Sequence, residues 1–232
     1  MSDAATGLVW YVVFLFSTTL HEAAHAWAAK RGGDLTAYHG GQVSLDPRPH
    51  IRREPFGMLV LPLFSALTSG WPIGFASSPY DPLWAAAHPR RAAWMSLAGP
   101  AANLLLVLLA SAAIWAGIAA GWFAVPERVS GLSVVAAPHG GLAGGAALFA
   151  SGCFTLNLIL CLFNLLPLPP LDGAGAVGLL LPAAAAQRFS ALLRRPVLAL
   201  AGIVAAWTLF GPLFQRVFRL AIALLYPGSA FE

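Results

Sequence analysis

Four long apolar runs constrain the fold of this chain more than any other feature of its sequence. They cover residues 8–29, 95–125, 142–166 and 197–214. About 20 apolar residues in a helix cross the hydrocarbon core of a bilayer, because each residue adds about 1.5 Å of rise. Only 9% of the residues are charged, which is too few to cover a water-facing surface and excludes a soluble globular enzyme. We therefore expect an all-α, polytopic transmembrane helix bundle with four main spans.

Two further segments and the charge balance complete the predicted architecture. Residues 56–76 are apolar but interrupted by prolines and glycines, and we expect a re-entrant or interfacial segment there. Residues 215–226 are typical of a C-terminal amphipathic interfacial helix, with Arg216 and Arg219 on one side. No linker is long enough to separate two domains, so residues 1–232 are expected to form a single membrane-embedded domain. A net charge of +4 without a dense basic patch excludes a nucleic-acid partner and leaves the lipid bilayer as the surroundings.

The first chemical motif is His21-Glu22-Ala23-Ala24-His25, inside the first apolar run. Two histidines four residues apart lie on one face of a helix, so both imidazoles can reach one metal ion. The intervening Glu22 lies beside that ion and can accept a proton from water. Ionisable residues are expensive in a transmembrane helix and indicate a functional site by default. The alternative, polar residues that reach the nearby membrane surface, is disfavoured because His and Glu side chains are short.

A catalytic zinc needs a third protein ligand, and Asp172 is the acidic residue that immediately follows an apolar run. It lies in the segment Asn164-Leu-Leu-Pro167-Leu-Pro-Pro-Leu171-Asp172-Gly173, whose prolines forbid a regular helix. Irregular backbone at membrane depth is tolerated where it is buried in protein or lines a polar cavity. We therefore expect this segment to fold back toward a site, with Asp172 at its tip. A proline-rich turn with an exposed aspartate is the alternative.

These motifs resemble those of the site-2 protease family of intramembrane zinc metalloproteases. The resemblance covers about residues 8–180, the expected catalytic core, and rests on His21-Glu22-x-x-His25, Gly99-Pro100-x-x-Asn103 and Asn164-x-x-Pro167-x-x-x-Leu171-Asp172-Gly173. It implies one zinc ion (Zn2+) per chain, a membrane protein or peptide as substrate, and a compact bacterial form without a PDZ or CBS domain. The roles that it assigns are zinc ligand to His21, His25 and Asp172, general base to Glu22, and stabilisation of the oxyanion to Asn164.

Two further asparagines lie in the apolar runs. For Asn103, support of the active site and hydrogen bonding between helices are equally favoured, whereas for Asn157 hydrogen bonding between helices is preferred. Asn157, Cys161 and Asn164 share one helix face. Because asparagine is costly against lipid, this face is expected to point into the bundle.

The positions of the metal motifs also predict the topology. His25 and Asp172 both lie near the ends at which their spans leave the membrane, so those two ends must be on one face. This arrangement requires residues 56–76 to turn back rather than cross. Arg128, Arg216 and Arg219 then lie on one face, and the other ten of the thirteen basic residues lie on the opposite face. The positive-inside rule places the active site toward the cytoplasmic side of the plasma membrane.

The resemblance and the residues together predict a multi-pass membrane endopeptidase that hydrolyses membrane-spanning substrates with zinc and Glu22. The alternative function is a non-proteolytic membrane metal-binding scaffold, or an ion transporter with the same His, Glu and Asp cluster. An ion path would instead scatter its ionisable groups through the depth of the bilayer. A protease must hold its substrate extended, and residues 40–45 or 71–75 offer a short edge strand, with ordinary loops as the equal alternative. The sequence leaves the oligomeric state open.

Overall fold

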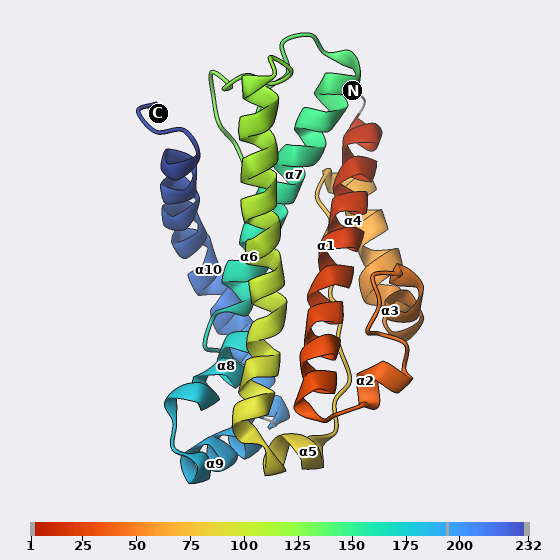
Figure 1. The fold of residues 1–232 in the computed structure, drawn as a ribbon, viewed down its shortest axis with the longest axis vertical. Coiled ribbons are helices and arrows are strands. Elements are labelled where there is room, and N and C mark those ends of the chain that lie inside the picture. The colour runs from red at the N-terminus through yellow and green to blue at the C-terminus, as the bar shows by residue number, and fades with distance from the viewer. Residues whose placement is uncertain (1–2, 194, 230–232) are drawn as a thin grey trace.

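Four long helices dominate the structure, a computed structural model that describes residues 3–193 and 195–229 (Figure 1). These helices are α1 (Asp3–Gly32), α6 (Pro89–Ala119), α7 (Gly141–Asn164) and α10 (Pro196–Leu225). Each of them is long and apolar enough to cross a membrane. The prediction of an all-α polytopic bundle with four main spans is therefore confirmed. Arg194, one of the ten basic residues assigned above to the active-site face, lies outside the described residues.

Short helices connect the long ones. They are α2 (Thr36–His39), α3 (Pro47–Arg53), the π-helix η1 (Phe56–Val60), α4 (Leu61–Ser69), α5 (Pro82–Ala87), α8 (Asp172–Ala176), the 3-10 helix η2 (Val177–Leu180) and α9 (Ala183–Leu193). The local sequence explains where α3 and α5 begin. Each follows an aspartate, Asp46 or Asp81, whose carboxylate accepts a hydrogen bond from the backbone N–H two residues later (3.0 and 2.8 Å). A proline then occupies the first helical position, where no N–H is needed.

The long helix α1 packs against α4, α6 and α7 (Figure 1). Near its start, Trp10, Val13 and Phe14 are buried against Leu156 of α7. A second apolar cluster joins α6, α7 and the last part of α10, and the loop between α6 and α7 covers it. Large apolar side chains on the outer faces stay exposed, as helices that meet lipid require. The bundle therefore presents an apolar outside and reserves its buried polar side chains for its interior.

Residues 56–76 turn back within the bundle instead of crossing it. The helix η1 has five residues and α4 nine, which together give about 21 Å of helix, short of the roughly 30 Å hydrocarbon core. The helix α4 packs on the first part of α1, where a side chain at Gly7 would lie 2.2 Å from the carbonyl oxygen of Ala66. The chain then runs back in extended conformation to the other end of α1 (Figure 1). The segment therefore turns back toward the end of the bundle at which it began, as the topology argument requires of a re-entrant or interfacial segment.

Asp34 fastens this returning segment to the end of α1. Its carboxylate accepts hydrogen bonds from the N–H and hydroxyl of Thr36 (2.9 and 2.6 Å) and from the N–H of Asp81 (2.8 Å). Burial by itself would raise the pKa of the Asp34 carboxyl, but the three hydrogen bonds outweigh burial and hold that pKa below its ordinary value. The ionised carboxylate therefore joins the ends of α1, α2 and the returning segment.

The structure corrects the expectation for the C-terminal segment. Residues 215–226 do not form a separate interfacial helix, because α10 continues through Pro212 to Leu225. Phe218, Ile222 and Leu225 belong to the apolar cluster shared with α6 and α7. The apolar face of this segment is therefore used inside the bundle and not at the membrane surface.

The stretches that offered edge strands are loops. Residues 40–45 form turns and bends, and residues 72–75 follow a bend at Trp71 without regular secondary structure. Within residues 3–193 and 195–229, the only β pairing is two isolated bridges in the loop between α6 and α7. The loop alternative of the sequence analysis is therefore the correct one for both stretches.

Candidate metal centre

The helix α1 places His21 and His25 on one face, one turn apart. Both side chains are buried, with 5% of each residue exposed. Their Nε2 atoms are 3.1 Å apart, and the two rings are nearly perpendicular at 81°. The two imidazoles therefore turn the same ring nitrogen toward one point.

Asp172 reaches the same point as the first residue of α8. Its Oδ2 atom is 3.1 Å from Nε2 of His21 and 3.2 Å from Nε2 of His25. Two glycines let the loop before Asp172 pack closely. A Cβ at Gly173 would lie 2.2 Å from the carbonyl oxygen of Leu165, and a Cβ at Gly202 of α10 would lie 1.8 Å from that of Pro169. The structure thus brings together the three residues that the sequence analysis named as ligands.

The three donor atoms fit a tetrahedral zinc ion. Zinc lies about 2.0–2.1 Å from nitrogen and oxygen ligands, so two ligands of a tetrahedral ion are about 3.3–3.4 Å apart. The three separations here are 3.1–3.2 Å, close to that value. Two imidazoles and one carboxylate are also a donor set that zinc accepts. Three protein ligands leave the fourth position for water or substrate, as a catalytic zinc site requires.

Gly99 of α6 leaves room beside these donor atoms. A Cβ at this position would lie 2.4 Å from Nε2 of His25 and 2.5 Å from Nε2 of His21. No ordinary carbon contact is that short, so even a methyl group would have to displace both rings. In the sequence, Gly99 stands out only as the first residue of the motif Gly99-Pro100-x-x-Asn103. Its role beside the metal centre was missed, although it lies in one of the three motifs.

Hydrogen bonds on the far side of each imidazole direct the Nε2 lone pairs toward Asp172. Nδ1 of His25 donates to the backbone carbonyl of Met95 (2.7 Å), and Nδ1 of His21 lies 2.5 Å from Oδ1 of Asn103. A carbonyl oxygen only accepts, so His25 carries its proton on Nδ1. Asn103 is fully buried and contacts a candidate ligand directly, which favours support of the active site over simple helix packing. The part of Met95 was missed because a sequence motif does not report a backbone carbonyl.

Glu22 and Asn164, the two predicted catalytic residues, are placed differently. Glu22 is 5% exposed beside His21, and no hydrogen bond or ion pair joins its carboxylate to another described residue. Burying a carboxylate is costly, and a cation held at the neighbouring donors would offset that cost. Asn164 is the last residue of α7, and its side chain donates to the carbonyl of Leu160 (3.0 Å). No hydrogen bond within the described residues joins it to the three donors, so its role stays a prediction, as does that of Glu22.

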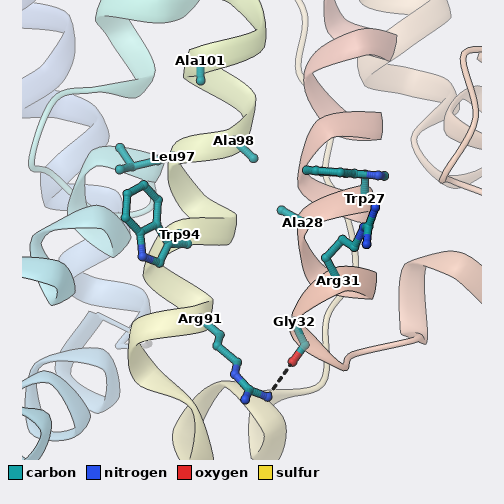
Figure 2. A pocket seen from close by; sticks show the side chains of 9 residues that line it. All are labelled: Trp27, Ala28, Arg31, Gly32, Arg91, Trp94, Leu97, Ala98 and Ala101. Carbon is teal, nitrogen blue, oxygen red and sulfur yellow. Dashed lines mark hydrogen bonds between the residues drawn. The ribbon is translucent and has the colours of Figure 1, made fainter.

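A groove of about 400 Å³ opens between α1 and α6, the two helices that contribute the histidines and Gly99 (Figure 2). Alanines line much of it, and Trp27 and Trp94 flank it. Arg91 spans one end by donating to the carbonyl oxygen of Gly32 (3.1 Å). Ala98 and Ala101 precede and follow Gly99 on α6, so the groove extends along α6 as far as the level of the metal centre.

Comparison with known proteins agrees with this geometry. Residues 9–209 match peptidase family M50. Over 175 residues the chain is 35% identical to "Putative zinc metalloprotease YwhC" of Bacillus subtilis, an alignment that covers 74% of this chain and 68% of that protein. Over 147 residues it is 35% identical to "Putative zinc metalloprotease Rip2" of Mycobacterium tuberculosis, which covers 58% of this chain and 54% of that protein. No solved structure matches.

The family match includes all three candidate ligands as well as Gly99 and Asn103. The chain spans about two thirds of the length of YwhC and about half that of Rip2. The resemblance to site-2 proteases is confirmed, and so is zinc as the metal of the family. The chain belongs to peptidase family M50, the site-2 protease family of zinc-dependent metalloproteases.

Proposed function

We propose that the chain hydrolyses peptide bonds of membrane-spanning substrates within the bilayer, near the cytoplasmic side of the plasma membrane. One observation carries this proposal: two of the three converging donors, His21 and His25, are buried on a helix that is itself long and apolar enough to cross a membrane. A site at that position meets the backbone of a membrane-embedded chain more readily than that of a soluble protein. Family membership favours this hydrolytic function over the scaffold or transporter alternative.

The chemistry follows from the residues around the three donors. Zinc held by His21, His25 and Asp172 would supply a Lewis acid that activates water and polarises the scissile carbonyl. Glu22, next to His21 on α1, is proposed as the general base that accepts a proton from the attacking water. The same carboxyl then delivers this proton to the leaving amine. Burial of Glu22 keeps bulk water from taking the proton first.

Asn164 is proposed to stabilise the oxyanion that forms on the substrate. One N–H of its side-chain amide is bound to the carbonyl of Leu160, which leaves the second N–H for the substrate. It lies at the end of α7, where the loop that carries Asp172 begins. Loss of one such donor typically costs about 10²–10³ in rate.

The distribution of basic residues supports the cytoplasmic orientation. The end of α1 and the start of α6 lie at the same end of the bundle as α9 (Figure 1). Lys30 and Arg31 on α1 and Arg90 and Arg91 on α6 gather there, whereas Arg128 lies in the loop at the opposite end. Basic residues accumulate on the cytoplasmic side of membrane proteins, so the end with α9 is proposed to face the cytoplasm.

The returning segment offers a place for an extended substrate. Residues 71–81 run beside α1. At one end the ring of Trp71 packs on that of Trp10 (centroids 4.7 Å apart), and at the other end Asp81 is hydrogen-bonded to Asp34. The segment is extended but pairs with no strand in the described part of the chain. The N–H groups of Ile73 and Phe75 are already bound to Ser65 and Gly57. A substrate backbone is therefore proposed to pair with the opposite edge of this segment, because a helical peptide bond is shielded by its own hydrogen bonds.

The proposal is tested with purified protein and a tagged model substrate that has one transmembrane helix. Wild type should cleave it, and a zinc chelator should stop the cleavage. Glu22→Gln should keep the fold and zinc but lose nearly all turnover, because an amide cannot accept the proton. Glu127→Gln, at an exposed position in the loop between α6 and α7, is the matched control and should cleave normally. Substantial cleavage by Glu22→Gln would refute the assignment of the general base, and chelator-resistant cleavage would refute the metal mechanism.

A further inference from the structure

We infer that Asn157 of α7 is a positioning residue for the metal centre, which acts through Asn103 of α6 to hold His21 in the tautomer that binds zinc. The inference rests on His21 being a zinc ligand, which the proposed function also requires. Asn157 lies in none of the three motifs, and its place in an apolar run predicted only hydrogen bonding between helices.

A continuous path of hydrogen bonds connects the backbone of α7 to the ring of His21. Nδ2 of Asn157 donates to the carbonyl oxygen of Cys153 (2.8 Å) and to Oγ of Ser17 (2.9 Å). Nδ2 of Asn103 donates to Oδ1 of Asn157 (2.8 Å), and Oδ1 of Asn103 lies 2.5 Å from Nδ1 of His21. Both asparagines are completely buried. The path therefore crosses three spans without contact with water.

The carbonyl oxygen of Cys153 fixes the direction of every bond along this path. It can only accept, so Asn157 must turn its amide nitrogen toward Cys153 and its Oδ1 toward Asn103. Asn103 must then present Nδ2 to Asn157 and Oδ1 to His21. Because that oxygen can also only accept, His21 must carry its proton on Nδ1. The lone pair is left on Nε2, the atom that lies 3.1 Å from Asp172.

Without Asn157, no partner would distinguish the two ends of the Asn103 amide. An amide flip exchanges nitrogen and oxygen at nearly the same positions. The flipped amide would offer an N–H to Nδ1 of His21, and the ring proton would move to Nε2, where it blocks the metal. His25 needs no such path, because its Nδ1 donates directly to the backbone carbonyl of Met95.

Hydrogen bonding between helices, without any effect on the metal, is the competing explanation. A purely structural Asn157 would stabilise the bundle equally with and without zinc. Its loss would lower the unfolding temperature but leave the zinc affinity of the folded protein unchanged. A positioning role instead predicts a lower zinc affinity together with a second tautomer of His21.

The test measures the zinc affinity of the full chain by competition with a chromophoric chelator at one pH, next to thermal unfolding. Asn157→Leu should weaken zinc binding about 10- to 100-fold, the usual effect of losing support behind a metal ligand. Thr155→Val is the matched control: Thr155 is 1% exposed on the same helix, and its hydroxyl has no hydrogen-bond partner, so zinc affinity should not change. In protein loaded with one equivalent of zinc and carrying ¹⁵N-labelled histidine, NMR should show His21 with its proton on Nδ1 alone in wild type. In Asn157→Leu a second population of His21, with the proton on Nε2, should appear.

The same substitution in an Asn103→Asp background distinguishes an effect through the hydrogen-bond path from a general loss of stability. In Asn103→Asp both side-chain oxygens accept, so the proton on Nδ1 of His21 no longer depends on position 157. Adding Asn157→Leu, or the smaller change Asn157→Ala if the former does not fold, should then barely alter zinc affinity. An equal loss of zinc affinity in the wild-type and Asn103→Asp backgrounds would overturn the inference. So would an unchanged zinc affinity and an unchanged His21 tautomer in folded Asn157→Leu. Full zinc occupancy in His21→Ala would instead overturn the ligand assignment and the proposed function with it.

Discussion

Replacing Gly99 by alanine should remove most of the zinc affinity while the helix bundle stays folded. The added methyl carbon would lie 2.4 Å from Nε2 of His25 and 2.5 Å from Nε2 of His21. Real Cβ atoms essentially never come closer than 3.0 Å to another heavy atom, so both rings must move by about half an ångström or more. Ligand distances in a zinc site tolerate only about 0.2 Å, and the movement exceeds this tolerance. We expect an affinity loss of about 100-fold, equivalent to about 2.8 kcal/mol.

Chelator competition on purified protein measures this loss, and metal content after gel filtration checks it independently. Gly211→Ala on α10 is the matched control, because nothing lies within 4 Å of a Cβ at that position. Alanine favours a helix interior by about 1 kcal/mol over glycine, so the control should fold at least as well and keep its zinc. A zinc affinity in Gly99→Ala equal to that of the control would refute the placement of both Nε2 atoms beside position 99.

Three further outcomes test other parts of the structure. The stabilisation that Asp34 gives through its lowered pKa should be complete above pH 3.8 and disappear as the pH falls through the folded-state pKa. Unfolding temperatures measured against pH should show this loss. In Asp34→Asn the unfolding temperature should fall less steeply at acid pH. Single cysteines at the exposed positions Arg52 and His88, without the native cysteines, should react with an impermeant reagent from the cytoplasmic side, and one at Ser133 from outside. Labelling of the first two from opposite faces would contradict the re-entrant segment. In Gly202→Ala the added methyl group should push against the loop before Asp172 and lower the zinc content below that of Gly211→Ala on the same helix. Equal zinc content in the two variants would show that the loop moves to accommodate the methyl group.

The spans and the candidate ligands were predictable because short-range rules determine both. The length of an apolar run sets the length of a membrane helix, and the periodicity of that helix puts His21 and His25 on one face. Asp172 was predictable because few acidic residues lie next to an apolar run and because its proline-rich surroundings had to fold against protein. The turn of residues 56–76 followed from the requirement that both halves of the metal site meet.

The remaining features depend on contacts that side-chain motifs do not encode. Gly99 contributes by the side chain that it lacks, and Met95 and Cys153 contribute backbone carbonyls. The direction of the amide of Asn157 is set by a neighbour four residues away, which no spacing rule reveals. The extent of α10 was missed because the apolar run ends at residue 214 and Arg216 and Arg219 suggested a separate helix, whereas the apolar face of that segment packs inside the bundle.

The contact at Gly202 ties the helical register of the last span to Asp172, the proposed third zinc ligand. Most of α10 faces outward, and an apolar surface against lipid tolerates rotation about the helix axis. The turn at Gly202 does not, because only a hydrogen atom fits against the carbonyl of Pro169. Inserting or deleting one residue before position 202 would rotate the helix by about 100° and bring a side chain onto that carbonyl. The rotation of a helix that supplies no ligand is therefore fixed by its contact with the loop that leads to Asp172.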